Sequence, residues 1–359
     1  MARFFILFFS LYGCMHAYIF LRLRPLISGG RRRIFFAFFL FLMVVVPMVV
    51  RMAEREGFAD ISVGFAWAGY VWMGFAFLLI VFLGLNDLLT LAMRIRLAGG
   101  GVRYGEQSKL RALRIAVGAA VICTGYGLCE ALIIRTEHLT VRSPKIPANV
   151  SRIRVVQLSD VHVGVMIGKW RLKRMLDKVA AARPDLLVAT GDIVDGQIHR
   201  LDGLSELFRG VAPPDGSFAV LGNHEFYVGL GNSLEFLSKS GFHILRNEAV
   251  TIFPYLVIAG VDDPAALRWG NVAGSNERGL LANRGGSQYT ILLKHRPAVD
   301  PASIGKLDLQ LSGHVHKGQI FPFNFLTYLS FPVHAGINYL ANGSILYVSR
   351  GTGTWGPPI

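Results

Sequence analysis

The stretch Val155–His162, VVQLSDVH, indicates the fold class of this 359-residue chain. It lies within a short apolar run, Ile153–Leu158, that is typical of a buried β-strand. Ser159, Asp160 and His162 follow the run at once. In α/β proteins, active sites form where polar side chains follow the ends of buried strands. The stretch therefore predicts one strand of an α/β domain and one part of its site.

Other apolar runs are followed by polar groups in the same way. The runs are Leu186–Ala189, Phe218–Leu221, Tyr289–Leu293 and Leu307–Leu311. The groups that follow them are GDIVDG at 191–196, GNHE at 222–225, KHRP at 294–297 and SGHVH at 312–316. Further strands are expected at Leu256–Ala259 and Ile345–Val348, and helices at Lys169–Ala182 and Ser233–Ser240. This alternation of strands and helices predicts an α/β fold.

The residue types in these groups favour divalent metal ions, because carboxylate and imidazole suit mixed nitrogen and oxygen sites for Mn, Fe or Zn. In an extended segment, residues i and i+2 point to the same side, so Asp160 and His162 can converge, as can His314 and His316. The neighbouring glycines let the backbone turn sharply and a phosphate approach closely. A lone histidine is usually structural, but here the ligand-type positions share one geometric explanation.

The motif order DxH, GD, GNH, H and GHxH resembles the calcineurin-like metallophosphoesterase superfamily over roughly residues 150–355. The preceding apolar segments and the ending YVSRGTGTWGPP at 347–358 resemble the branch of transmembrane proteins with a metallophosphoesterase domain. The resemblance implies an α-helical membrane domain of four transmembrane helices. An α/β metallophosphoesterase domain, in which helices sandwich two β-sheets, would follow it.

The resemblance also implies two divalent metal ions, which could be Mn, Fe, Zn or Ni, with Mn favoured. The ligands carried over are Asp160, His162 and His316 for the first ion, Asn223, His295 and His314 for the second, and Asp192 bridging both. A hydroxide between the ions would attack phosphorus. The catalytic residues would be Asp192 and His224, and His224 would contact the phosphate and protonate the leaving alkoxide.

Three more residues are expected to support the site or contact the substrate. We expect Glu225 to orient His224 and Asp195 to stand behind the metal ligands. Lys317 replaces the first glycine of the family's usual GHxHGGQ, and its cation would either assist an anionic substrate or point to solvent. Asp262 and Asp263 are interpreted as turn residues. The histidines outside any motif, interpreted as structural or surface residues, are His199, His243 and His334.

The N-terminal part of the chain is predicted to span a membrane. The chain is 52% hydrophobic and only 17% charged, whereas soluble domains are about a quarter charged. The segments that approach the roughly 20 residues needed to cross a bilayer are Phe4–Leu21, Ile34–Val50, Ile61–Leu85 and Ile115–Ile134. We interpret the first as a retained helix, because Arg22 follows it without a small-residue cleavage site.

Charge separates membrane topology from nucleic-acid binding. The net charge of +14 divides into +9 over residues 1–135 and +5 over residues 136–359, so the basic excess lies in the apolar part. The basic residues of the first and third loops are Arg22, Arg24, Arg31, Arg32, Arg33, Arg94, Arg96, Arg103, Lys109, Arg111 and Arg114. Because cytoplasmic loops carry the positive excess, both loops should be cytoplasmic and the C-terminal domain extracytoplasmic.

A change of composition after residue 135 sets the predicted domain boundaries. Prolines and scattered charges replace the apolar runs. We therefore predict a transmembrane four-helix domain at 1–135, a linker at 136–150 and a metallophosphoesterase domain at 151–359.

The leading hypothesis is a membrane-anchored metal-dependent phosphoesterase that hydrolyses a phosphodiester or pyrophosphate bond in a lipid-linked or envelope substrate. The stretch Gln319–Leu340 bears on the substrate, because it is rich in Phe, Tyr and Leu directly after the GHxH loop. An apolar rim there would suit a lipid-linked phosphate. Packing against the helix bundle or the domain core explains the stretch equally well.

Alternatives come from other classes. The domain could be a non-catalytic binding or scaffold protein on a phosphoesterase fold, or a UDP-diacylglucosamine-type pyrophosphatase if it faces the cytoplasm. A transporter would need more intramembrane charge than His16 and Glu130 supply, and a hydrogen bond to a neighbouring helix explains His16 more simply. The expected partners are the lipid bilayer and the substrate. Nucleic acid is not expected, and no protein partner can be inferred.

Overall fold

A computed structural model describes residues 2–96, 105–196, 203–269 and 274–359. Arg103 and His199, named above, lie outside these ranges. The chain forms two compact units, one of Met1–Ile133 with Gly356–Ile359 and the other of Ile134–Trp355. Each unit is described by itself.

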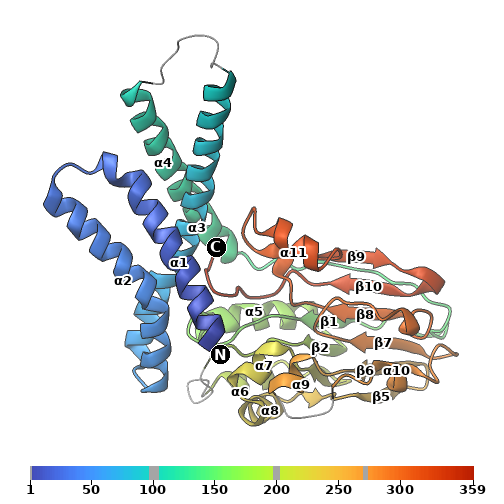
Figure 1. Ribbon diagram of the computed structural model, residues 1–359. Coiled ribbons are helices and arrows are strands. Elements are labelled where there is room, and N and C mark those ends of the chain that lie inside the picture. The colour runs from blue at the N-terminus through green and yellow to red at the C-terminus, as the bar shows by residue number, and fades with distance from the viewer. Residues whose placement is uncertain (1, 97–104, 197–202, 270–273) are drawn as a thin grey trace. The chain divides into compact units, whose positions relative to one another are not determined.

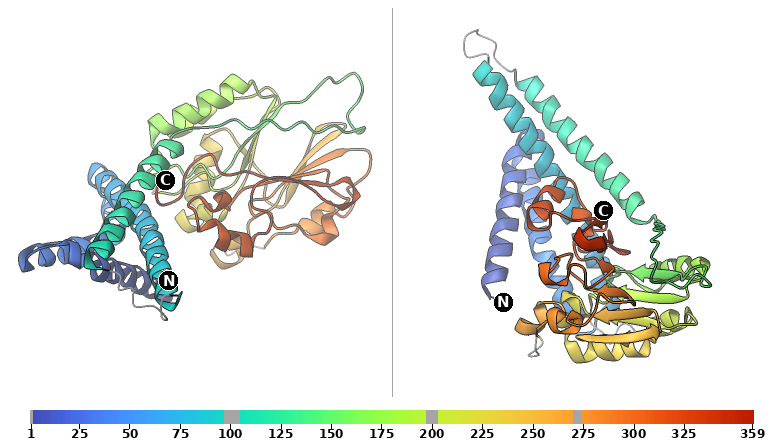
Figure 2. Two further views of the ribbon diagram at one scale, coloured as in Figure 1. Left: turned by 90° about the horizontal axis from the view of Figure 1, so that it is seen from above. Right: turned by 90° about the vertical axis from the view of Figure 1, so that its right-hand side faces the viewer.

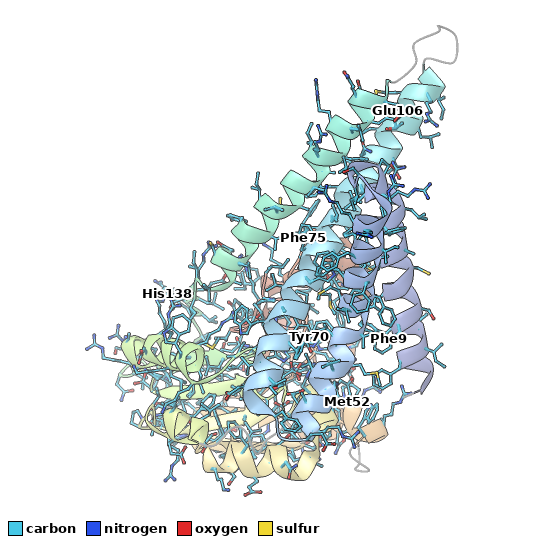
Figure 3. All side chains as sticks on the ribbon, turned by 90° about the vertical axis from the view of Figure 1, so that its left-hand side faces the viewer. Phe9, Met52, Tyr70, Phe75, Glu106 and His138 are labelled. Atoms are coloured by element: carbon cyan, nitrogen blue, oxygen red, sulfur yellow. The ribbon has the colours of Figure 1, made fainter. Side chains whose placement is uncertain are left out.

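The first unit consists of long helices that are blue to green in Figures 1 and 2. They are α1 (Ala2–Leu23), α2 (Gly30–Arg55), α3 (Ala59–Arg96) and α4 (Glu106–Ala131). All four are long and apolar enough to cross a membrane, as the sequence predicted. Large apolar side chains such as Phe35 and Phe41 are exposed along them, and Figure 3 shows side chains projecting all along these helices. Only lipid covers so much apolar surface without cost.

Polar contacts join α1 to α3. The indole Nε1 of Trp72 donates to Nε2 of His16 at 2.8 Å, and Nδ1 of His16 donates to the Tyr12 carbonyl at 2.7 Å. Asp87 of α3 accepts a hydrogen bond from the Tyr18 hydroxyl at 2.9 Å and pairs with Arg22. His16 therefore makes the interhelical hydrogen bond that the simpler interpretation expected.

The last four described residues group with the helices, whereas we had assigned them to the C-terminal domain. The physical reason is the Ile359 side chain, which is buried against Gly74 of α3 and Gly127 of α4. A side chain at either glycine would occupy the space that Ile359 fills. Small residues thus let an apolar group approach the helix backbones closely.

The second unit contains two sheets, which Figure 1 shows with their strands side by side. The four-stranded parallel sheet has the order β1 (Val155–Leu158), β2 (Leu186–Thr190), β3 (Ser217–Val220) and β4 (His243–Ile244). The six-stranded sheet has the order β5 (Glu248–Phe253), β6 (Leu256–Gly260), β7 (Tyr289–Leu293), β8 (Leu309–Ser312), β10 (Ile345–Val348) and β9 (Gly336–Tyr339). Its edge strands β5 and β9 pair antiparallel, and its inner strands are parallel.

Helices cover the sheets, so the predicted two-sheet α/β fold is confirmed. They are α5 (Lys169–Ala182), α6 (Leu204–Arg209), α7 (Asn223–Val228), α8 (Leu230–Lys239), α9 (Ala265–Trp269), α10 (Glu277–Leu281) and α11 (Asn324–Ser330). On β2, Leu186 and Val188 enter the core between the two sheets, while Leu187 and Ala189 enter the core against the helices. This alternation follows from the two-residue period of a strand.

Residues 136–150, which we predicted as a linker, belong to the second unit. Val141 and Ile146 pack against the core between the sheets, and Nζ of Lys145 lies 2.8 Å from a carboxylate oxygen of Asp308. The segment contains no described helix or strand. It is held by side-chain contacts, which composition alone does not reveal.

The packing of α2 against α3 gives a testable prediction. A Cβ at Gly69 of α3 would collide with Val46 of α2, whereas Gly84 of the same helix has open space beside it. We expect Gly69→Val to lower the free energy of unfolding by about 1–3 kcal/mol through overpacking. The matched control Gly84→Val should change it little. Thermal unfolding in detergent measures both, and equal midpoints for the two variants would contradict this packing.

Candidate metal centre

The candidate site lies where the carboxyl ends of parallel strands from both sheets meet. Asp160 and His162 follow β1, Asp192 follows β2, and Asn223 begins α7 after β3. From the other sheet, His295 follows β7, and His314 and His316 follow β8. Parallel strands bring their carboxyl ends to one edge, so residues more than 150 positions apart become neighbours.

A first group of donors consists of Asp160, His162 and His316, whose ligand-type atoms all lie within 4.8 Å of one another. The Nε2 atoms of His162 and His316 are 3.1 Å apart, and Nε2 of His316 lies 3.6 Å from Oδ1 of Asp160. Asp160 and His162 are almost fully buried. Nδ1 of His162 has no hydrogen-bond partner among the described residues.

A second group consists of Asp192, His295 and His314, again within 4.8 Å of one another. Nε2 of His295 lies 3.1 Å from both Oδ2 of Asp192 and Nδ1 of His314. Oδ1 of Asn223 lies 3.3 Å from the same nitrogen. Asp192 also belongs to a third group, with His162 and His224, so its carboxylate lies between the first and second groups.

The backbone is left-handed at five of these positions. The φ angles are 53° at Asp160, 54° at His162, 53° at Asp192, 74° at His314 and 45° at His316. For a residue with a Cβ this conformation costs roughly 1–2 kcal/mol. Strain of this kind persists where the surrounding structure fixes a functional geometry.

Lys317 shares this conformation, with a φ of 53°, and its side chain is exposed. The GHxHGGQ motif quoted above would have glycine at this position, and glycine adopts positive φ without strain. The chain therefore carries a strained, solvent-facing cation beside His316. Of the two expectations for Lys317, the exposed side chain agrees with the one that points it to solvent.

Electrostatics divides the histidines into two classes. Burial lowers the pKa of His162 to about 4 and, together with the neighbouring His295, that of His314 to about 2. Burial likewise lowers the pKa of His316. Burial alone would also lower the pKa of His295, but the Asp192 carboxylate outweighs it and raises the pKa to about 10. Burial alone would raise the pKa of Asp192, but His295 and other histidines hold it well below its usual range.

These properties fit divalent cations. A neutral imidazole offers a lone pair to a metal, and three of the buried histidines are neutral at pH 7. Pairs of ring nitrogens face each other at 3.1 Å, with an ionised carboxylate between the pairs. Nδ1 of His295 donates to the Thr190 carbonyl at 2.8 Å, which directs its Nε2 toward the other donors.

The carboxylate beside His224 is Asp195, and our expectation that Glu225 would orient this histidine was wrong. Oδ1 of Asp195 accepts a hydrogen bond from Nδ1 of His224 at 2.6 Å. Burial alone would lower the pKa of His224, but Asp192 and Asp195 outweigh it and raise the pKa to about 9. His224 is therefore protonated at neutral pH.

Glu225 is completely buried and instead holds the loops of the site. Its carboxylate accepts backbone N–H groups of Asp192, Ile193 and Val194 after β2, and of Gly222 after β3, at 2.7–3.2 Å. A signal for part of this role exists in the sequence, because Glu225 stands three residues after Gly222 at the start of α7. A glutamate at that spacing reaches back to the N-cap backbone.

Three ion pairs near the site were not predicted from the sequence. Arg246 pairs with Asp262, Arg296 with Asp263 and Lys294 with Glu277, at 2.6–2.7 Å. Asp263 also accepts the N–H of Ala265, which agrees with its interpretation as a turn residue. Two of these pairs line a cavity of about 470 Å³ together with His295.

His243 and His334, which match no motif, contact Glu248 and Tyr328 away from the donor groups.

Comparison with known proteins agrees with this site. The fold and the donor groups are those of a metal-dependent phosphoester hydrolase. The model of the calcineurin-like phosphoesterase family matches residues 153–318, and an uncharacterized metallophosphoesterase of Aquifex aeolicus is 42% identical over 67% of this chain and 92% of the relative. The chain therefore belongs to the calcineurin-like phosphoesterase family, which implies a dinuclear site for divalent metal ions.

Other relatives are named as transmembrane proteins. A transmembrane protein with metallophosphoesterase domain from Danio rerio is 30% identical over 80% of this chain and 68% of the relative. Among solved structures, a dimetal phosphatase from Danio rerio matches 56% of this chain and 88% of that chain, with a TM-score of 0.37 and 13% identity. The four apolar helices and the relatives named as transmembrane proteins make this a multi-pass membrane protein.

The His224–Asp195 contact gives a pH-dependent prediction for the metal-free protein. The pKa of His224 is raised from 6.5 to about 9, so the stability that its protonated form contributes is present below pH 6.5 and lost as the pH rises through 9. Asp195→Asn removes part of this contribution. We expect the wild type to melt several degrees higher than the variant at pH 6.5, with the gap closing by pH 10. A gap that stays constant with pH would contradict the charge interaction. Melting curves of chelator-treated protein measure it.

Proposed function

We propose that this protein hydrolyses a phosphodiester or pyrophosphate bond in a lipid-linked or envelope substrate, with two divalent metal ions, Mn favoured. The observation that carries the proposal is that Asp192 lies with His295 and His314 in one donor group and with His162 and His224 in another, so that it connects the two sets of donors. A buried structural cluster would need neither shared donors nor a charged imidazole at its edge.

The residues in the two groups would hold the metals. The proposed ligands are Asp160, His162 and His316 for one ion, Asn223, His295 and His314 for the other, and Asp192 for both. Bound there, the ions would act as Lewis acids on phosphate oxygens and lower the pKa of water. Either site has mixed nitrogen and oxygen donors, which Mn, Fe, Zn and Ni all accept.

His224 would act as the general acid. Its side chain is mostly buried but reaches solvent, and the hydrogen bond from Nδ1 to Asp195 fixes the ring. This leaves Nε2 to donate a proton to the leaving alkoxide. Without metal the Asp192 and Asp195 carboxylates raise the pKa of His224 to about 9. With Asp192 bound to the ions, the hydrogen bond to Asp195 would be the contact that holds the proton on the ring.

Charge near the site favours a diester over a monoester. A monoester dianion calls for additional unpaired cations, but Arg246, Arg296 and Lys294 are each neutralised by a carboxylate, and the Lys317 side chain is exposed to solvent. The cavity beside His295 combines paired charges of both signs, which suits a polar leaving group better than a free phosphate.

Two alternatives remain testable. A scaffold on the same fold would bind metal without turnover, and the complete set of donor residues makes this the weaker candidate. A UDP-diacylglucosamine-type pyrophosphatase would require the domain to face the cytoplasm. The basic loops of the membrane unit support an extracytoplasmic domain, and therefore an extracytoplasmic lipid or envelope phosphodiester.

The enzymatic proposal predicts a separation between metal binding and turnover. In the purified full chain, we expect two bound metals and metal-dependent hydrolysis of bis(p-nitrophenyl) phosphate, faster than of the monoester. His224→Ala should lower the rate by about a hundredfold or more with metal retained. Asp192→Ala should lose metal and activity together, and the surface control His243→Ala should change neither. Metal content and initial rates measure these outcomes.

The results separate the alternatives. Two bound metals without turnover of either ester would favour the scaffold. No bound metal after reconstitution with Mn would contradict the dinuclear site itself. Comparable losses in His243→Ala and His224→Ala would contradict the role of the Asp195–His224 pair.

The proposed sidedness predicts a labelling pattern in intact cells. With Cys14, Cys123 and Cys129 replaced by Ala, Thr251→Cys on exposed β5 should react with an impermeant maleimide. Ser108→Cys, exposed in the first turn of α4 at the end of this helix that is predicted to be cytoplasmic, should react only after permeabilisation. The reverse pattern would place the domain in the cytoplasm and favour the pyrophosphatase alternative.

A further inference from the structure

The segment after the metal-binding loop carries an exposed apolar surface, here called the apolar rim. It consists of Phe321, Phe323, Phe325, Leu326, Tyr328 and Leu329. These residues are between 42% and 78% exposed, so they do not belong to the domain core. Phe331 and Val333, which follow, do pack against a small core cluster with Val315. The core interpretation of this stretch thus holds for Phe331, Val333 and Leu340 and fails for the rim.

The rim lies in a stretch without charge. Residues 318–349 contain no Asp, Glu, Lys or Arg, although the chain as a whole is 17% charged. Surfaces that face only water carry charges that keep proteins soluble and apart. A group of exposed Phe, Leu and Tyr side chains without charge is typical of a surface that meets an apolar phase.

Hydrogen bonds connect the rim to the candidate site. Gln319, at the start of this stretch, exchanges two hydrogen bonds with the backbone of Trp355 at 3.0 and 3.1 Å. Trp355 is half exposed, and its ring centroid lies 6.3 Å from that of His224. Tyr227, also half exposed, lies 5.5 Å from His224 by the same measure. The start of the stretch that carries the rim is therefore hydrogen-bonded to Trp355, whose exposed ring lies near the proposed general acid, His224.

Chain connectivity identifies the apolar phase. The second unit is joined to the membrane unit at both ends, because Ile133 precedes it and Gly356 follows Trp355 directly. Trp355 is therefore next in sequence to the membrane unit, and the rim is bonded to Trp355 through Gln319. Phe and Leu side chains enter the boundary of headgroups and acyl chains, and Tyr and Trp are enriched there.

We propose that the apolar rim inserts into the bilayer interface, so that the metal centre takes the phosphate of a lipid headgroup from the same membrane. This inference rests on the proposed phosphoesterase function and narrows its substrate to a phospholipid or lipid-linked phosphodiester presented by a membrane. The rim supplies membrane contact, and the metal centre supplies the chemistry.

A fluorescence experiment on the full chain tests the insertion without reference to catalysis. In the chain with its three cysteines replaced by Ala, Leu329→Cys is labelled with the fluorophore NBD and reconstituted into vesicles of phosphatidylcholine and phosphatidylglycerol. The matched control is Thr251→Cys on β5, which is exposed and lies at the opposite edge of the six-stranded sheet from β9. Lipid carrying a shallow doxyl group quenches only labels that reach the interface.

We expect the label at residue 329 to shift to the blue and to lose about half of its emission or more, while the label at 251 loses little. Equal, weak quenching at both positions would overturn the proposal. Oxidative cross-linking between two Leu329→Cys chains, without quenching, would assign the rim to a second copy and also overturn it.

A kinetic measurement separates the rim from the active site. We compare hydrolysis of a vesicle-bound phospholipid that carries a nitrophenyl phosphodiester with hydrolysis of soluble bis(p-nitrophenyl) phosphate. Phe325→Asp with Leu329→Asp should lower the ratio of lipid to soluble turnover about tenfold or more, because carboxylates resist insertion. Thr251→Asp should leave the ratio unchanged. An unchanged ratio in the rim variant would contradict the proposal.

Failure of the proposed function looks different. If the wild-type chain hydrolyses neither diester, the phosphoesterase proposal fails, while the quenching at residue 329 still decides whether the rim enters the bilayer.

Discussion

The buried carboxylate of Glu225 is the interaction on which the rest of the site depends. It joins the loop after β2 to the loop after β3 through four backbone N–H groups. Hydrogen bonds to a charged acceptor are each worth about 1.5–3 kcal/mol, and no water replaces them at a fully buried position. Burial and the Asp192 charge raise the pKa of Glu225 to about 7, so holding this carboxylate next to a second one is costly. The hydrogen bonds to Glu225 act against this cost and fix the position of Asp192.

The strained backbone around the site follows from the same constraint. Asp192 can bridge two donor groups only if its chain turns sharply after β2, which gives it a positive φ. A Cβ at Gly222 would collide with the Asp192 carboxylate, and one at Gly313 would collide with Ser159 and Asp160. The motif glycines are thus needed for close approach between loops, beyond the turns themselves. The left-handed backbone at the donor residues and the glycines beside them together allow many donor side chains to pack into a small volume.

Helices and strands whose residue pattern lies within one short segment were predicted correctly from the sequence. The buried strand Tyr289–Leu293 and the helix Lys169–Ala182 were predicted with their observed bounds. The strand is a continuous apolar run, and the helix has apolar residues at helical spacing. The edge strands β5 and β9 were missed, since they are short or half-exposed. The donor residues were found because they occur as spaced motifs at strand ends.

Contacts between side chains on different loops could not be predicted from the sequence in the same way. Asp195 and Glu225 both lie near His224 in any reasonable arrangement, and only the turn after β2 decides which carboxylate reaches the ring. The pairs of Arg246 with Asp262 and Arg296 with Asp263 depend equally on tertiary distances. The position of Gly356–Ile359 depends on the space left by two glycines on different helices. No periodicity or motif spacing in the sequence indicates such tertiary contacts.

The segment that completes the site is also the one that returns to the membrane unit. The N–H groups of Thr352 and Gly353 donate to the carbonyls of Ser159 and Asp160 at 2.7 and 2.9 Å, so this segment fixes the loop that carries the first donors. Trp355 then reaches toward His224, and the next residue belongs to the membrane unit. A soluble phosphoesterase would gain nothing from this connection. In a membrane protein the connection matters, because the residues that fix the loop of the first donors are followed directly in sequence by the membrane unit.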